Sequence, residues 1–200
     1  RSRRTSWCRV SDDEPAGGGP AADEEAIARV VRTFFAAFVS GPELAGRIDP
    51  ASRDVTGANR ALADEAGHGT AVAGTAAAGR NDLNTVGLAF NSSIIALRAD
   101  EPGTCADTSA TGGCNFYDSA IANGVDAARL AGAKVINMSL GGDPPGSSLV
   151  QAIGRAVGAG IVVVISAGND GAADADPFGL GAAQAYPGRV IIAGALDGGL

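Results

Sequence analysis

A single histidine stands in a setting where it can act as an acid or a base. His68 lies between Gly67 and Gly69, and a run of small residues follows it up to Gly74. An imidazole exchanges its proton near neutral pH, so a positioned histidine is the commonest general base in enzymes. Small residues allow a helix to approach a neighbouring sheet closely. The string predicts a catalytic histidine at the start of a tightly packed helix. An ordinary histidine in a glycine-rich turn is the alternative.

The string Ser139-Leu140-Gly141 directly follows an apolar run rich in β-branched residues. Backbone amides and carbonyls beside a glycine suit pairing with an extended peptide in the manner of an added strand. An ordinary turn after a strand is the alternative, because Pro and Gly follow within five residues.

A second such string, Ala167-Gly168-Asn169, follows the next β-branched run. The side-chain amide of Asn169 can donate a hydrogen bond to a negatively charged oxygen that develops during attack on a carbonyl. The alternative is an asparagine that tolerates a tight turn after a strand.

These strings, in this order along the chain, resemble those of the subtilisin-like serine peptidases, the subtilases. The resemblance implies an α/β fold with a mostly parallel sheet and a serine-type endopeptidase activity on extended peptides. It implies that His68 is the catalytic base and that Asn169 is the oxyanion donor. It also implies that the substrate-binding residues are Ser139, Leu140, Gly141, Ala167 and Gly168.

Two members of the family's catalytic triad are not recognisable. The family carries an Asp in an Asp-Ser/Thr-Gly turn before the histidine and a Ser in a Gly-Thr-Ser turn after the asparagine. No acidic residue lies between Glu25 and Glu43, where that Asp is expected, and no Gly-Thr-Ser string occurs. We therefore expect this chain to be inactive on its own, as the middle of a subtilase domain that is incomplete at both ends. The alternatives are a pseudopeptidase that binds peptides without cutting them and a nonfunctional gene remnant.

Residues 1–40 differ from the rest of the chain. Residues 1–22 are rich in Arg, Gly, Pro and Asp without periodicity, which is typical of disorder. A subtilase would show a buried strand in the following stretch, yet the apolar spacing there favours a helix, and we predict the helix. The residues that carry this spacing are Ile27, Val30, Val31, Phe34, Phe35 and Phe38. The interpretation is an atypical, partly disordered segment over 1–40 and a partial subtilase domain over 41–200.

Apolar periodicity beyond residue 41 alternates between helical and strand patterns. Alternating strands and helices indicate an α/β domain with a mostly parallel sheet. The predicted helices are 68–78, 116–130 and about 149–157, and the predicted strands are 86–89, 94–99, 134–140, 161–165 and 189–195.

The composition excludes several other functions. The formal net charge of −7 argues against a nucleic acid partner. The longest apolar runs are far too short to span a bilayer, so no transmembrane segment is predicted. A chain of 200 residues is long enough for one domain with a sizeable core.

Two cysteines lie close together in a loop rich in Gly, Thr and Ser. Cys105 and Cys114 are near enough in sequence to close a small disulfide ring, with two free thiols as the alternative. A disulfide implies an oxidising compartment. Together with the string Leu97-Arg98-Ala99-Asp100, this loop resembles the subtilase passengers of bacterial autotransporters. That resemblance implies secretion or display on the bacterial cell surface.

No cofactor or metal is predicted. Many subtilases bind calcium, and oxygens of Asn81, Asp82 and Asn84 could ligate one in the loop after the predicted histidine helix. A polar turn is the interpretation that we favour for these residues.

Overall fold

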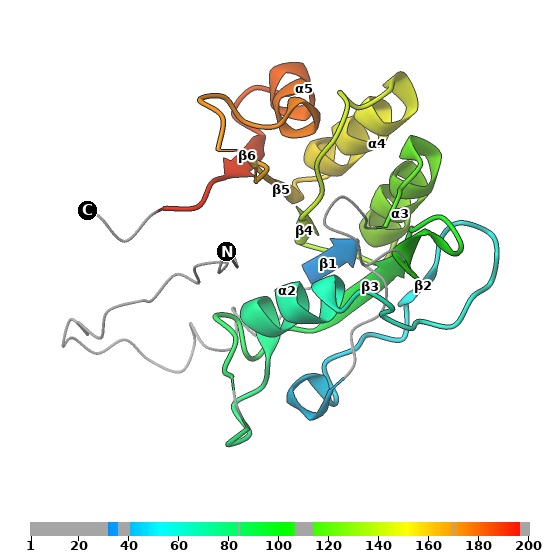
Figure 1. Ribbon diagram of the computed structural model, residues 1–200, viewed down its shortest axis with the longest axis vertical. Helices are drawn as coiled ribbons and strands as arrows, with labels where there is room; N and C mark the ends of the chain where they lie inside the picture. The colour runs from blue at the N-terminus through cyan, green and yellow to red at the C-terminus, as the bar shows by residue number, and fades with distance from the viewer. Residues whose placement is uncertain (1–31, 36–40, 84, 107–113, 170, 197–200) are drawn as a thin grey trace.

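The computed structural model describes residues 32–35, 41–83, 85–106, 114–169 and 171–196 (Figure 1). Within these ranges, strands and helices alternate along the chain. The strands are β1 (Arg32–Phe35), β2 (Arg53–Asp54), β3 (Ile94–Arg98), β4 (Val135–Met138), β5 (Val162–Ser166) and β6 (Val190–Ala193). The helices are α2 (His68–Ala77), α3 (Asp118–Leu130), α4 (Ser147–Gly158) and α5 (Pro177–Ala185), with short 3-10 turns η1 (Pro42–Leu44) and η2 (Thr104–Ala106).

The six described strands form one sheet in the order β2-β3-β1-β4-β5-β6, and all five neighbouring pairs are parallel. This arrangement confirms the predicted α/β class with a parallel sheet. Parallel strands all end at the same edge of a sheet, and α/β proteins bind ligands beyond that carboxyl edge. Segments that follow the strands are therefore the place to look for a site.

Side chains on both faces of the sheet are buried, because successive residues of a strand point to opposite faces. Ile95 and Leu97 of β3 pack in a large apolar cluster with residues of α3, α4 and α5. Their neighbours Ile94 and Ala96 pack in a smaller cluster with residues of α2. The described residues thus form three layers, with α2 on one face of the sheet and α3, α4 and α5 on the other (Figure 1).

The helix predicted over residues 27–38 is wrong for residues 32–35, which form β1. This strand pairs with β3 on one side, Arg32 opposite Ile94, and with β4 on the other, Arg32 opposite Val135. Without β1, both neighbours would lose a row of backbone hydrogen bonds, so tertiary pairing outweighs the local helical spacing. The remainder of the predicted helix and the predicted disordered segment 1–22 lie outside the described residues. The predicted boundary at residue 40 falls after β1, so the sheet takes a strand from the segment before it.

The strand predicted over residues 86–89 is also wrong. The amide of Gly87 donates to Ala78 O at 2.9 Å, and the amide of Ala89 donates to Ala76 O at 2.8 Å. These bonds satisfy carbonyls at the end of α2, which have no partner within their own helix. Gly87 allows this contact, because a Cβ there would lie 2.4 Å from the backbone nitrogen of Ala77.

The other predicted elements are present with bounds that differ by one or two residues at some ends. Strand β2 and helix α5 were not predicted. None of the helices in the described part of the chain is long and apolar enough to cross a membrane.

We expect the substitution Ile136→Ala to destabilise the protein by about 2–5 kcal/mol, because it empties a fully buried position in the centre of the sheet. The matched control is Ile191→Ala in β6, where the side chain is 52 % exposed. That change should cost less than about 1 kcal/mol. Urea unfolding followed by circular dichroism measures both values, and equal losses would contradict the described sheet.

Candidate active site

Two of the predicted strings leave the sheet side by side. Strands β4 and β5 are parallel neighbours, with Met138 opposite Ile165 at their carboxyl ends. The segment Ser139–Gly142 follows β4, and the segment Ala167–Asn169 follows β5. We call them the first wall and the second wall. Neighbouring strands therefore carry both walls to the same edge of the sheet.

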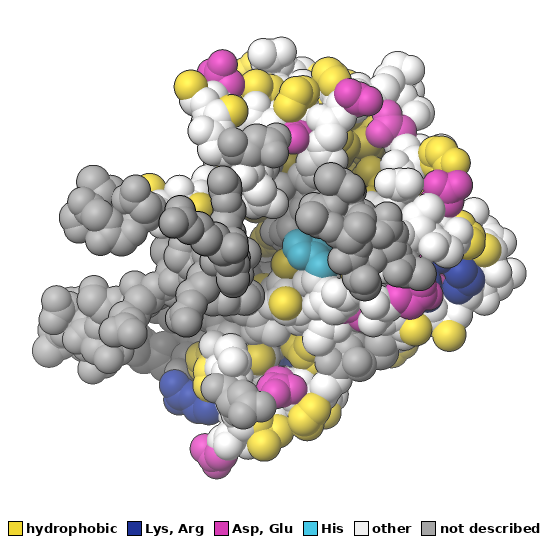
Figure 2. All heavy atoms as spheres, in the orientation of Figure 1, with side chains coloured by type: hydrophobic (Ala, Val, Ile, Leu, Met, Phe, Trp, Pro, Cys, Tyr) yellow, Lys and Arg dark blue, Asp and Glu magenta, His cyan; other side chains and the backbone are white. Residues whose placement is uncertain are grey.

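His68, at the start of α2, contacts the first wall. It is the first residue of α2, its side chain is exposed, and its Nε2 lies 3.1 Å from the carbonyl oxygen of Ser139. The protein's one histidine is visible at the surface in Figure 2. A carbonyl oxygen only accepts hydrogen bonds, so this contact is a hydrogen bond in the tautomer that carries a proton on Nε2. Among the described residues, no carboxylate is hydrogen-bonded to this imidazole.

Asp64 holds the backbone on either side of His68. One oxygen of its carboxylate accepts from the Gly67 amide at 2.7 Å, and the other accepts from the Thr70 amide at 2.8 Å. The first amides of a helix lack intrahelical partners, and an aspartate before the helix commonly satisfies them. Asp64 therefore positions the start of α2, although sequence reasoning gave it no role. Its place four residues before the histidine was the available signal.

A buried ion-pair network holds the loop that leads into α2. Arg60 donates to Asp54 at 2.9 Å and to Asp100 at 2.7 Å. Arg98 donates to Asp100 at 3.0 Å and to Glu65 at 2.7 Å. Burying a charge is costly unless it is paired, and the side chains of Asp100 and Arg98 are almost fully buried. The network ties the loop before the histidine to the end of β3.

Asp54 is the carboxylate at one end of this network, where it pairs with Arg60. Burial alone would raise the pKa of its carboxyl group, but hydrogen bonds from Thr56 and Arg60 outweigh burial and lower that pKa from 3.8 to about 2. The donors are the hydroxyl and amide of Thr56 together with the amide and guanidinium of Arg60. The carboxylate is therefore held in its charged form.

Two backbone carbonyls of the first wall are in hydrogen-bond contact with side chains. His68 contacts the Ser139 carbonyl, and the Ser166 hydroxyl donates to the Leu140 carbonyl at 2.6 Å. Gly141 is exposed, and none of the hydrogen bonds within the described ranges involves its backbone. Gly141 is therefore the residue of this wall whose backbone amide and carbonyl remain available to an extended peptide.

The second wall borders a hollow of about 760 Å³. Ala167, Gly168 and Asn169 line it, and Gly168 has a φ of +89°, which a glycine adopts without strain. Asn169 is exposed, and its side-chain amide takes part in none of the hydrogen bonds within the described part of the chain. It keeps both N–H groups for a ligand.

A groove of about 740 Å³ lies between α2 and the sheet, with His68 at its rim. Its lining is mostly apolar and includes Val72 of α2, Val164 of β5 and the exposed Leu88. The structure brings His68 to the first wall and Asn169 to the second wall of the same edge. That the two side chains reach one substrate carbonyl stays a prediction.

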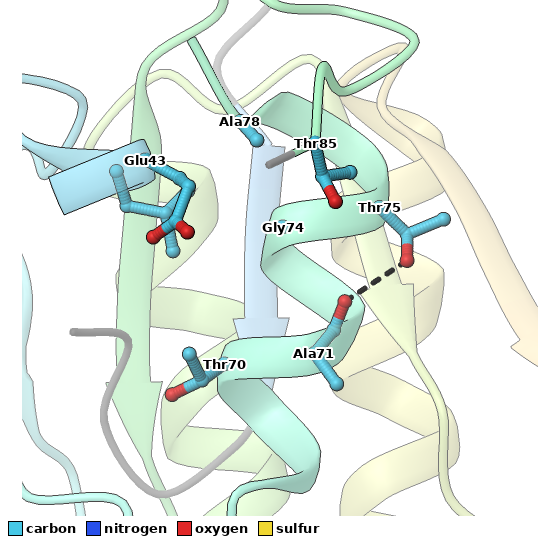
Figure 3. A pocket seen from close by; sticks show the side chains of 8 residues that line it. Glu43, Thr70, Ala71, Gly74, Thr75, Ala78 and Thr85 are labelled. Carbon is cyan, nitrogen blue, oxygen red and sulfur yellow. Dashed lines mark hydrogen bonds between the residues drawn. The ribbon is translucent and has the colours of Figure 1, made fainter. Parts of the chain in front are cut away.

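Figure 3 shows a smaller hollow of about 350 Å³ beside α2. Its polar side chains are Glu43, Thr70, Thr75 and Thr85. The Thr75 hydroxyl donates to the Ala71 carbonyl at 3.0 Å, which is the usual bond of a threonine within a helix. His68 does not line this hollow, so we do not assign it to the site.

The loop that could hold calcium contains a hydrogen-bonded turn. Asn81 donates its amide to Pro42 O at 3.1 Å and accepts from the Leu83 amide at 3.4 Å. Asp82 has a φ of 59°, as is common for aspartate in turns. Asn84 lies outside the described residues. No group of three His, Cys, Asp or Glu residues that could hold a metal occurs within the described ranges. Both polar groups of the Asn81 side chain are thus used within this turn, and we derive no step through a calcium ion.

Cys105 and Cys114 form a disulfide in the structure, with Cα atoms 4.1 Å apart. The bond lies next to the ion-pair network, because Glu101 follows Asp100 and its amide donates to Asn115 O at 2.8 Å. The disulfide therefore closes a loop at the end of β3.

Residues 34–198 of the chain match the subtilase family. Subtilisin DY of Bacillus licheniformis is 39% identical over 137 residues, which are 67% of this chain and 44% of that protein. A subtilisin of Bacillus pumilus is 33% identical over 129 residues, 64% of this chain and 43% of that protein. An alkaline protease of Alkalihalobacillus alcalophilus is 38% identical over 109 residues, 54% of this chain and 26% of that protein. The chain spans less than half the length of these relatives.

We expect the ion-pair network to contribute less to the free energy of unfolding in acid than at neutral pH. A carboxyl group whose pKa is lower in the folded than in the unfolded state stabilises the fold above its unfolded pKa, and this stabilisation disappears as the pH falls through the folded pKa. For Asp54 the window runs from pH 3.8 down to about 2. The shift corresponds to about 2 kcal/mol at neutral pH.

The measurement is urea unfolding of the native chain and of Asp54→Asn at a series of pH values. The difference between their free energies of unfolding should shrink across this window. The control is Asp174→Asn, because Asp174 is exposed and should show little difference at any pH. A difference for Asp54→Asn that does not change with pH would contradict the role of the charge.

Proposed function

Because this chain belongs to the subtilase family, we propose that it supplies the histidine base, the oxyanion donor and the peptide-binding edge of a serine-type endopeptidase. The observation that carries the proposal is the contact between His68 Nε2 and the Ser139 carbonyl, since it joins the histidine helix to the first wall. A substrate bound along that wall would lie beside the imidazole. The binding partner that we propose for this chain is a peptide or protein segment in extended conformation.

Each residue has a distinct chemical part in this proposal. His68 accepts the proton of an attacking hydroxyl and returns it to the leaving amine. Asn169 donates to the oxygen of the tetrahedral intermediate, where such a donor is worth about 10²–10³ in kcat, a magnitude measured in subtilisin itself. Gly141 pairs with the peptide backbone, and Ala167 and Gly168 form the opposite wall.

Neither Ser139 nor Ser166, the serines at the carboxyl ends of β4 and β5, is arranged as a nucleophile. The Ser139 hydroxyl accepts from the Asn137 side chain at 3.0 Å, and the Ser166 hydroxyl donates its proton to the Leu140 carbonyl at 2.6 Å. His68 needs a serine hydroxyl to deprotonate and a carboxylate to orient its ring. The described residues provide neither group. Hydrolysis by this chain alone is therefore not expected, and the triad would be completed by residues beyond those described.

Peptide binding without cleavage is the second candidate. The exposed, unpaired backbone of Gly141 favours it, because strand addition needs no nucleophile. The disulfide between Cys105 and Cys114 supports export to an oxidising compartment under either candidate. The passenger type of bacterial autotransporters fits the same loop and the string Leu97–Asp100, and it remains part of the proposal.

We expect the 200-residue chain to bind a labelled extended hexapeptide but not to cleave it at the rate of a subtilase. Without the full triad, only about 10³–10⁴-fold acceleration over water remains. Binding is measured by fluorescence anisotropy, and turnover is measured with a fluorogenic version of the same peptide. The control peptide carries N-methyl groups on alternate amides and should bind about tenfold more weakly, because it cannot pair its backbone.

Two outcomes would count against this proposal. Turnover that His68→Ala abolishes and that a serine-directed inhibitor blocks would show that the chain holds its own nucleophile. Equal affinity for the native and N-methylated peptides would show that Gly141 is not a peptide-pairing edge.

A further inference from the structure

Asp176, just before α5, contacts both walls of the site. Its Oδ1 accepts from the Gly142 amide of the first wall at 2.9 Å. Its own backbone amide donates to the Ala167 carbonyl of the second wall at 2.8 Å. One residue therefore joins two segments that leave the sheet from different strands.

The space around Asp176 is filled on both sides. A Cβ on Gly141 would lie 2.9 Å from Asp176 Oδ2, and a Cβ on Gly168 would lie 2.9 Å from Asp176 Cβ. Contacts this short do not occur with real Cβ atoms. The two glycines that flank the proposed peptide path are thus the residues that let Asp176 sit between the walls.

Helix α5 gives Asp176 a rigid base. The Phe178 amide donates to Asp176 Oδ1 at 3.0 Å and to the Gly142 carbonyl at 3.1 Å. The Phe178 side chain is buried in the large apolar cluster, so this end of the helix is anchored in the core. Further along, a Cβ on Gly181 would lie 2.7 Å from Pro145, so α5 also packs closely on the turn after the first wall.

Capping α5 does not account for all of these contacts. An N-cap side chain needs to accept only from the first amides of its own helix, and Phe178 supplies that bond. The bond to Gly142 connects Asp176 with a residue 34 positions away. It is an added restraint on the end of the first wall, where Gly141 and Gly142 are exposed.

We propose that Asp176 is a positioning residue that holds the two walls in register for an extended peptide. This inference rests on the proposed function, because it concerns the edge where the peptide pairs. Ordering a mobile wall on binding costs conformational entropy, and a wall that is already held avoids that cost. Asp176 thus raises peptide affinity without touching the peptide.

Three substitutions separate the two roles of the Asp176 side chain, the N-cap of α5 and the hydrogen bond to Gly142. Asp176→Asn keeps an oxygen acceptor and removes the charge. Asp176→Ser keeps a good N-cap for α5 but has a shorter side chain with a single oxygen, so it cannot bridge to Gly142 as well. Asp176→Ala removes both bonds. Asp174→Ala is the control, because it lies in the same loop, is exposed and takes part in none of the bonds within the described residues.

The first readout is the affinity for the uncharged labelled hexapeptide Ala-Ala-Ala-Leu-Ala-Ala. We expect Asp176→Ser and Asp176→Ala to weaken binding about tenfold, the effect of losing one charge-assisted hydrogen bond. Asp176→Asn should stay within about threefold of the native chain, and Asp174→Ala should not change the affinity. The second readout is amide hydrogen exchange at Gly142, which should accelerate at least about tenfold in the Ser and Ala variants alone.

Thermal unfolding shows that each variant is folded at the temperature of the assay, and the Ser variant keeps the experiment decisive if the Ala variant unfolds. Native affinity in a folded Asp176→Ser protein would overturn the inference. Unchanged exchange at Gly142 in that variant would also overturn it, whether or not any peptide binds. A native chain that binds no peptide would instead overturn the proposed function, and the exchange data would still report on Asp176.

Discussion

Four residues of β1 hold together the two halves of the sheet. β1 pairs with β3 on one side and with β4 on the other, so it joins the pair β2-β3 to the trio β4-β5-β6. The helix that begins with His68 packs on Ala96 of the first half, whereas both walls of the site extend from the second half. The contact between His68 and Ser139 therefore depends on the pairing of β1 with both of its neighbours. A parallel sheet of this kind can place chemistry at its edge only when every strand between the reacting groups is in place.

Aspartates do most of the positioning around this site, and they do it through backbone amides. Asp64 accepts from amides at the start of α2, and Asp176 accepts from amides of α5 and of the first wall. Asp54 accepts from Thr56 and Arg60, which holds the loop before the histidine. A carboxylate forms stronger bonds to amides than a neutral acceptor does, so short loops can be held without a large apolar core beneath them. None of these three carboxylates is hydrogen-bonded to the imidazole.

The sequence was sufficient to predict a helix or strand where the local pattern and the tertiary context agree. The β-branched run before Ser166 and the small residues after His68 both predicted their elements, because burial on both faces and close packing each leave a plain pattern. The apolar spacing around Phe34 misled, since aromatic and β-branched residues suit a helix face and a central strand equally well until the neighbouring strands are known. Helix α5 was missed although Asp176 and Pro177 form a common helix start. The bridge from Asp176 to Gly142 leaves no sequence pattern at all, because it joins segments whose closeness only the fold creates.

The place of β1 also sets the order in which the chain can acquire its structure. Arg32 pairs with Ile94 and with Val135, so β1, the first of the described strands, lacks one of its two partners until about 100 further residues have been synthesised. Pairings between residues so distant in sequence close large loops and form slowly. During that interval β1 keeps an unsatisfied backbone edge of the kind that recruits other strands. A nascent chain that ends before β4 therefore leaves one edge of β1 without the strand that covers it in the folded protein.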